Sequence, residues 1–259
     1  MAGWKTTKEN NICKRKDGEC GNIALSFSTM ESPFSNIVRR YQSTFHPVVK
    51  TEPGEQMLSL NLTEQNRQLS NEVLADTDRF SGWINQQLEA AGSRYAIGGY
   101  GEKRKVYQTP LFAAERPGEE PRTVHLGIDI WGPAGTPVYA FMGGMVHSFA
   151  YNGLDGDYGA TIVLLHQLDG MAFYTLYGHL SLKDIQTLSA GQYIIFGQPI
   201  GHFGPPSENG NWPPHLHFQV ILDMELKEGD YPGVCRWSEK EKYFSNCPDP
   251  NLILQLIPA

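Results

Sequence analysis

Residues 213–222 read PPHLHFQVIL, a run in which His215 and His217 are separated by a single leucine. The apolar, β-branched and aromatic residues here predict a strand over residues 215–222. Side chains two residues apart in a strand point to the same face, so both imidazoles are expected on one face, about 6 to 7 Å apart. The residues between and after them point into the core. One histidine of such a pair can bind a metal while the other reaches a substrate.

A second run with metal-binding residue types is VHLGIDIW at residues 124–131, which contains His125 and Asp129. In a straight strand these two side chains would share a face but lie about 13 Å apart. That is too far for one ion, since its ligand bonds are only about 2 Å long. We therefore predict that the chain bends at Gly127, where the missing side chain lets the backbone turn sharply. Two histidines, a carboxylate and one open position are typical of a catalytic zinc site.

From Gly98 onward the sequence has the texture of a β protein, with frequent glycine and proline between short apolar runs. The expected strands cover residues 124–131, 137–140, 145–150, 161–168, 171–180, 193–196 and 215–222. Asp169-Gly170 separates two of them by the two residues that a tight hairpin turn prefers. Strands joined by hairpins without intervening helices indicate a mainly β fold with an antiparallel sheet.

The preceding region is expected to be mostly helical. Asp76 or Thr77 can cap a helix whose apolar side chains fall on one face, and Gly92 stands where a left-handed C-terminal cap is expected. We also expect a polar helix over residues 63–73, a short strand around 58–62, and a helix or strand over 34–41. The chain is thus divided into a leader or extension at 1–29, expected to be disordered, a mostly helical region at 30–97, a β-rich domain at 98–225, and an irregular tail at 226–259 that docks on the core.

Composition excludes some classes of partner. The chain has 259 residues, of which 28 are acidic and 21 basic, so its formal net charge is −7. Because phosphate binding needs a basic face, we expect no nucleic-acid partner. No apolar run reaches the roughly 18 to 20 residues that a membrane span needs, so we expect no membrane partner. We see no secretory signal and expect a cytoplasmic location; a leader removed beforehand would instead indicate a periplasmic or extracellular one.

Other residues with metal-binding side chains have simpler interpretations. A zinc site at Cys13 and Cys20 is conceivable, but their spacing is wider than usual, so we interpret the cysteines as free thiols. A lone histidine on an apolar strand is more often part of the core or surface than a ligand. That interpretation is given to His46, His147, His166 and His202.

Four short motifs, well separated in the sequence, follow one another in a distinctive order. His-x-Gly-x-Asp at residues 125–129 is followed by Tyr-Gly-His-Leu at 177–180, by a glycine-flanked Pro-Ile-Gly at 199–201, and by His-Leu-His-Phe at 215–218. This order resembles the lysostaphin/LytM-type zinc endopeptidases over roughly residues 98–225. The resemblance implies an antiparallel β-sheet fold of the duplicated hybrid motif type, with a groove between the sheet and flanking loops.

The resemblance also implies a role for each of five residues. His125, Asp129 and His217 would bind one Zn²⁺ per chain, and His179 and His215 would be the catalytic histidines. Members of this family cut peptides of peptidoglycan, so the expected substrate is a peptide or a peptidoglycan fragment. Which histidine acts as the base, which bond is cut and how the chain assembles stay open.

Three departures from the family pattern keep alternatives open. The loop at residues 205–214 is longer than usual before the HxH and is expected to cover the groove. No cell-wall targeting repeat is recognised, and no export signal is recognised. Separately, the stretch GGYGEKR at 98–104 is similar to proteins in which such a domain stands beside an aminotransferase. The alternatives to a peptidase are a non-catalytic LytM-like regulator and a small-molecule hydrolase or metal-binding scaffold that reuses the site.

Overall fold

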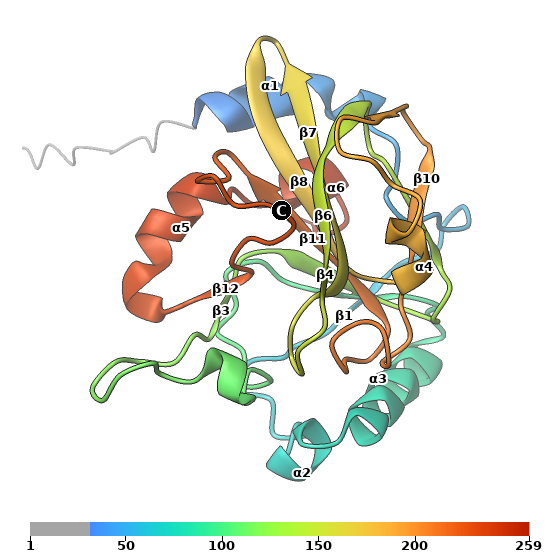
Figure 1. The fold of residues 1–259 in the computed structure, drawn as a ribbon. Helices are drawn as coiled ribbons and strands as arrows, with labels where there is room; N and C mark the ends of the chain where they lie inside the picture. Colours follow the sequence, from blue (N-terminus) through green and yellow to red (C-terminus); the bar gives the residue numbers. More distant parts are fainter. Residues whose placement is uncertain (1–31, 259) are drawn as a thin grey trace, which may run out of the picture. The chain divides into compact units, whose positions relative to one another are not determined.

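The computed structural model describes residues 32–258, so the expected leader at 1–29 lies outside the described residues. An eight-stranded sheet dominates this part of the chain (Figure 1). Its strands, in the order in which they lie side by side, are β1 (Leu58–Ser59), β2 (Ala96–Gly98), β4 (Ile128–Trp131), β11 (His215–Ile221), β8 (Met171–Leu180), β7 (Gly159–Leu168), β6 (Gly144–Asn152) and β9 (Tyr193–Ile194).

The sheet is antiparallel at every junction except β1–β2, which is parallel. Asp169 and Gly170 connect β7 to β8 with φ angles of 49° and 79°, the left-handed pair that a tight hairpin turn requires. Two small sheets complete the β structure: β5 (Pro137–Tyr139) pairs with β10 (Pro199–His202), and β3 (Val124–His125) pairs with β12 (Val234–Cys235). The predicted mainly β, antiparallel fold is confirmed.

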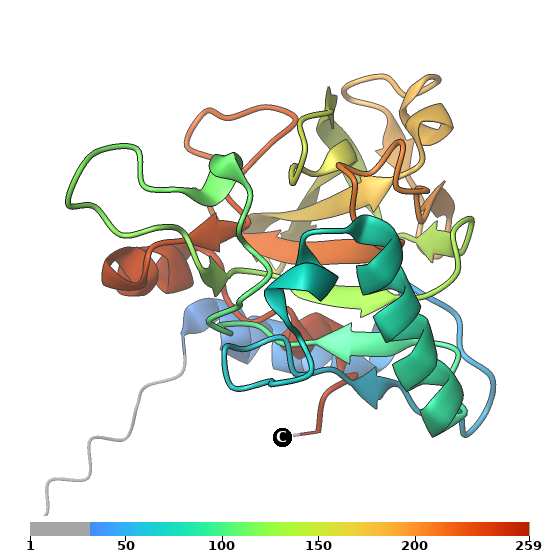
Figure 2. The same ribbon diagram turned by 90° about the horizontal axis from the view of Figure 1, so that it is seen from below.

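Short helices surround the sheet. The α-helices are α1 (Pro33–Tyr41), α2 (Asn71–Leu74), α3 (Thr77–Ala91), α4 (Leu182–Ile185), α5 (Lys240–Asn246) and α6 (Asn251–Leu254), and the 3₁₀ turns are η1 (Gln42–Thr44), η2 (Pro110–Phe112) and η3 (Trp237–Glu239). Asp76 caps α3 by accepting from the amide of Arg79, and Gly92 ends it with a φ of 62°. Both ends were predicted. In Figure 2, α3 (teal) lies beside the ends of the strands, where Phe80 packs in a cluster with Trp131.

The prediction of a polar helix over residues 63–73 is wrong. Only α2, at its end, is helical. Upstream, short polar side chains accept hydrogen bonds from nearby backbone amides: Asn61 from Thr63, Thr63 from Gln65, and Asn66 from Gln68. These local bonds compete with the helical pattern, so this segment forms successive turns instead.

Within the region expected at 30–97, the described residues from Ser32 onward form one compact unit with the β-rich region that follows. β2 crosses the expected boundary between residues 97 and 98 and pairs with β4, so Gly98 lies opposite Asp129. The tail at 226–259 is more regular than expected, since it contains β12, η3, α5 and α6. Its apolar end packs on the core, where Ile253 is buried. Among the described residues, no helix is long and apolar enough to cross a membrane.

β11 separates the core from the site. Leu216, Phe218 and Val220 belong to the main hydrophobic cluster of the sheet. Because side chains alternate along a strand, His215 and His217 point to the opposite face, as predicted. Both are buried, at 4% and 3% relative exposure, so this face is enclosed by the segments that pack over it.

Candidate metal centre and catalytic histidines

The predicted bend between His125 and Asp129 is present. β3 ends at His125 and β4 begins at Ile128, and the chain bends at Gly127 between them. A Cβ atom at Gly127 would lie 2.5 Å from Cε1 of His217 and 2.9 Å from the carbonyl oxygen of Phe218. Gly127 therefore permits both the bend and the close approach of the His217 ring.

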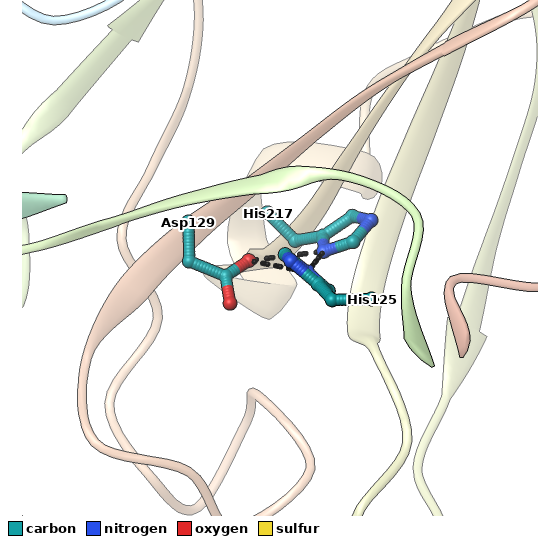
Figure 3. Close-up of side chains that lie close together, drawn as sticks. All are labelled: His125, Asp129 and His217. Carbon is teal, nitrogen blue, oxygen red and sulfur yellow. Dashed lines mark hydrogen bonds and ion pairs between the residues drawn. The ribbon is translucent and has the colours of Figure 1, made fainter. Parts of the chain in front are cut away.

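The bend brings the three predicted ligands together (Figure 3). Nε2 of His125 lies 3.0 Å from Nδ1 of His217 and 3.3 Å from Oδ1 of Asp129, and the last two atoms are 3.0 Å apart. Tetrahedral ligand atoms around zinc, each about 2.0 to 2.1 Å from the ion, are about 3.3 Å from one another. The triangle of donor atoms therefore fits a single small ion.

Each imidazole of the triangle is oriented through its other nitrogen. Nδ1 of His125 lies 3.1 Å from the carbonyl oxygen of Gly99, and Nε2 of His217 lies 2.9 Å from Oε1 of Gln219. Because both partners are acceptors, these nitrogens carry the protons, and the lone pairs of Nε2 in His125 and Nδ1 in His217 face the triangle. Metal-binding histidines in proteins are held in this way.

The charges of the site suit a cation. Burial opposes ionisation of Asp129, but neighbouring positive charge, including the buried Arg104 guanidinium, outweighs it and holds the pKa of this carboxyl well below its usual range. Burial, together with the positive charge of Arg104, lowers the pKa of His125 to about 3. The site thus offers an ionised carboxylate and a neutral imidazole, the protonation states that a metal ion requires.

His179 and His215 stand beside the triangle with their rings 4.0 Å apart between centroids. Nδ1 of His179 donates to the carbonyl oxygen of Asn209 at 2.8 Å, and Nδ1 of His215 donates to that of Pro213 at 2.7 Å. Nε2 of each ring is left as an acceptor. Burial lowers the pKa of His215 to about 4 and holds that of His179 well below its usual value, so both rings are neutral at pH 7.

A pocket opens over these five residues, all of which line it. Trp212, in the loop before β11, lines it and packs edge-on against His179, with ring centroids 6.4 Å apart. Asn209 fixes that loop, since its side chain donates to the carbonyl of Trp212 and accepts from the amide of the same residue. The loop expected to cover the groove therefore forms one wall of it.

Gln219 and Arg104 both contact the triangle, and neither was predicted from the sequence. Gln219 lies two positions after His217, so the period of the strand could have placed it on the same face. Arg104 contacts Asp129 from a segment without any regular pattern, so no comparable signal pointed to it.

Comparison with known proteins agrees with the geometry. Residues 123–228 match the profile described as "Peptidase family M23". This part of the chain is a peptidase family M23 domain. The resemblance to lysostaphin/LytM-type peptidases is thereby confirmed, and the M23 domain contains all five residues of the site.

Two curated relatives of the M23 domain have names that state an activity. The chain is 30% identical over 130 residues to the L-Ala--D-Glu endopeptidase of Bacillus subtilis, which aligns 46% of this chain with 37% of that protein. It is 28% identical over 142 residues to the peptidoglycan DD-endopeptidase ShyC of Vibrio cholerae, covering 51% of this chain and 30% of that one. The chain therefore spans about a third of these relatives.

Solved structures include a similar domain. The catalytic domain of lysostaphin from Staphylococcus simulans is 26% identical, with a TM-score of 0.40, and the match covers 68% of this chain and 97% of that domain. Arg104 and Gly99 precede the M23 domain in the sequence, although Arg104 contacts Asp129 and Gly99 contacts His125 within that domain.

Proposed function

We propose that this chain is a zinc-dependent endopeptidase that hydrolyses peptide bonds in peptidoglycan-derived peptides. In this proposal His125, Asp129 and His217 bind one Zn²⁺, and His179 and His215 act on the substrate and on the attacking water. The observation that carries it is the position of two neutral imidazoles, each with Nε2 left as an acceptor, beside a triangle of donor atoms in one pocket.

A bound zinc ion would supply Lewis acidity to the scissile carbonyl and to the attacking water. The chain's own groups account for proton movement. Nε2 of His179 or His215 can accept a proton from the water, and the resulting imidazolium can stabilise negative charge on the carbonyl oxygen or protonate the leaving amine. The hydrogen bonds from Nδ1 to the carbonyls of Asn209 and Pro213 keep each ring in the tautomer that this role needs.

The substrate class rests on the relatives. One is named for cleavage between L-Ala and D-Glu, and the other for peptidoglycan DD-endopeptidase activity. The pocket has aromatic walls, since Tyr107, Phe112 and Trp212 line it together. A peptide can lie along such walls with its scissile carbonyl over the donor triangle.

Digestion of defined muropeptides tests this proposal. The full chain, loaded with zinc, is incubated with cross-linked and uncross-linked muropeptides, and the products are identified by mass spectrometry. We expect cleavage of a peptide bond that stops when Asp129 is replaced by alanine or when a chelator removes the metal. Cleavage that survives both treatments would contradict a metal-dependent mechanism.

Two other outcomes would favour the alternatives. Tight binding of a muropeptide without any product, by a chain that contains zinc, would indicate a non-catalytic LytM-like regulator. Hydrolysis of simple esters or amides, with all muropeptides left intact, would indicate a hydrolase that reuses the site for small molecules.

A further inference from the structure

Asp129 uses its two carboxylate oxygens for different partners. Oδ1 faces Nε2 of His125 and Nδ1 of His217, at 3.3 and 3.0 Å. Oδ2 accepts a hydrogen bond from Nη1 of Arg104. The oxygen that would otherwise be free to turn toward an ion is therefore already occupied by a cation.

Arg104 is itself firmly held. Its side chain is 1% exposed, and its Nε donates to Oε2 of Glu102 at 2.9 Å. Nη1 also reaches the hydroxyl of Tyr107 at 3.3 Å, and the guanidinium lies over the ring of Trp131, 5.6 Å from its centroid. A buried guanidinium with this many fixed partners has little freedom to move, so it can act as a rigid support for Asp129.

The segment that carries Arg104 also fixes His125, the proposed ligand that precedes Asp129 in the sequence. The carbonyl of Gly99 accepts from Nδ1 of His125, and the carbonyl of Glu102 accepts from the His125 amide at 3.0 Å. The amide of Gly101 donates back to the His125 carbonyl at 2.9 Å. Upstream, Gly98 lies opposite Asp129, and a Cβ there would come within 2.8 Å of Nη2 of Arg104.

We propose, on the basis of the metal site proposed above, that Arg104 is a positioning residue that restricts Asp129 to binding the metal through Oδ1 alone. A carboxylate with both oxygens free can bind through two, which raises the coordination number and takes the position that a substrate or water needs. Glu102, 2.9 Å from Nε of Arg104, offsets part of the charge of the guanidinium that orients Asp129.

A direct role of Arg104 in binding substrate is the competing interpretation. Arg104 does line the pocket, but its donors are directed at Glu102, Asp129 and Tyr107. A substrate carboxylate would have to break these bonds inside a buried site. The two interpretations differ in what they predict for metal binding in the absence of substrate.

The test compares the full chain with Arg104→Met, Arg104→Lys and a matched control. Arg94→Met is the control, because Arg94 also binds a carboxylate (Glu55, at 3.2 Å) and a carbonyl and lies over the ring of Tyr95, but does so on the protein surface. Zinc affinity is measured by competition with a chelator, and Co²⁺ is added to the metal-free proteins to record its visible absorption. Thermal unfolding and circular dichroism establish that each variant is folded.

We expect Arg104→Met to bind zinc about 10- to 100-fold more weakly than the wild type, the range seen when groups behind a metal ligand are removed. Its Co²⁺ absorption should weaken, as it does when a four-coordinate ion gains a ligand. Arg104→Lys should recover part of both signals, because it keeps the charge but not the planar fork, and Arg94→Met should match the wild type.

Three results would overturn the proposal. Zinc affinity and Co²⁺ absorption of Arg104→Met equal to those of the wild type would show that Asp129 needs no support. A raised KM for peptide with unchanged metal affinity would assign Arg104 to substrate binding. If the wild-type chain binds neither zinc nor Co²⁺, both the proposed zinc-dependent function and the proposed role of Arg104 are wrong. The first two results contradict only the role of Arg104 and leave the proposed metal site in place. If Arg104→Met does not fold, Arg104→Lys alone decides, by a changed or unchanged Co²⁺ spectrum.

Discussion

Gln219 accepts a hydrogen bond from Nε2 of His217 at 2.9 Å, which leaves Nδ1 of that ring directed at Asp129. The amide of Gln219 is fixed in turn, since its Nε2 donates to the carbonyl oxygen of Pro232 at 3.1 Å and to Sγ of Cys247 at 3.3 Å. The tautomer of His217, a proposed metal ligand, therefore depends on a residue that belongs to neither the donor triangle nor the pair of His179 and His215.

Replacing Gln219 by methionine keeps the volume of the side chain but removes the acceptor. We expect zinc affinity to fall about 10- to 100-fold, because the His217 ring loses the bond that fixes its protonated nitrogen. Chelator competition measures the change. Gln167→Met, at an exposed position on β7, is the control and should leave zinc affinity unaltered. Equal affinity in both variants would mean that Gln219 does not orient His217.

Gly127→Ala tests the bend between His125 and Asp129. The added methyl group would lie 2.5 Å from the His217 ring, with the Phe218 carbonyl 2.9 Å away, so neither the ring nor the backbone can give way cheaply. We expect a loss of about 1 to 3 kcal/mol in the free energy of unfolding, together with weaker zinc binding.

Gly82→Ala is the matched control for this substitution. Gly82 lies exposed inside α3, and nothing is within 4 Å of the added methyl group. Alanine favours a helix over glycine, so this variant should gain about 0.5 to 1 kcal/mol. Urea unfolding of both proteins gives the comparison. A Gly127→Ala protein with the stability and zinc content of the wild type would mean that the close approach at Gly127 is not needed.

Replacing the proposed catalytic histidines should affect zinc binding and turnover differently from replacing a proposed metal ligand. His179→Ala and His215→Ala are expected to keep zinc but lose turnover by a factor of about 100 or more, as when a general acid or base is removed. His217→Ala should lose both. His147→Ala, on β6, where the ring bonds to Ser148 and packs against Tyr174, should retain both. Equal zinc content in the His215→Ala and His217→Ala proteins would contradict the division of roles.

The buried His166 should make the free energy of unfolding depend on pH. It is buried, with Nδ1 2.9 Å from the Gly143 carbonyl oxygen and Nε2 2.8 Å from Oγ1 of Thr175, and burial lowers its pKa to about 4. An unfolded chain binds this proton near pH 6.5. Between pH 4 and pH 6.5 the unfolded state therefore binds more protons than the folded state. The contribution of neutral His166 to stability is complete above pH 6.5 and is lost as the pH falls toward 4.

The corresponding variant is His166→Gln, which cannot be protonated. Between pH 7 and pH 4.5 we expect the wild type to lose about 2 to 3 kcal/mol more of its free energy of unfolding than the variant does. Urea unfolding at the two pH values gives both numbers. Parallel losses in the two proteins would rule out this contribution from His166.

Much of the fold could be predicted because local signals and tertiary structure agree. Asp169-Gly170 supports the left-handed angles of the β7–β8 turn, and Asp76 and Gly92 mark the ends of α3. The alternation of β11 placed both of its histidines on one face. In each case the residues that fix the structure are neighbours in sequence.

The parts that escaped prediction depend on contacts between distant residues. β2 is only three residues long, and its strand geometry comes from pairing with β4 more than thirty positions later. Arg104 carries no pattern of its own and acquires its role from Asp129, 25 residues away. The turns at residues 63–70 were mistaken for a helix because the side-chain bonds of Asn61 and Asn66 leave no periodic mark.

The most direct test of the metal centre is X-ray absorption at the zinc edge, recorded on the full chain purified without chelators. We predict about one zinc per chain, with a first shell of nitrogen and oxygen at about 2.0 to 2.1 Å and outer scattering from two imidazole rings. Sulfur at about 2.3 Å would place the ion at cysteines instead. That result, or less than about a tenth of a zinc per chain, would contradict the assignment of His125, Asp129 and His217.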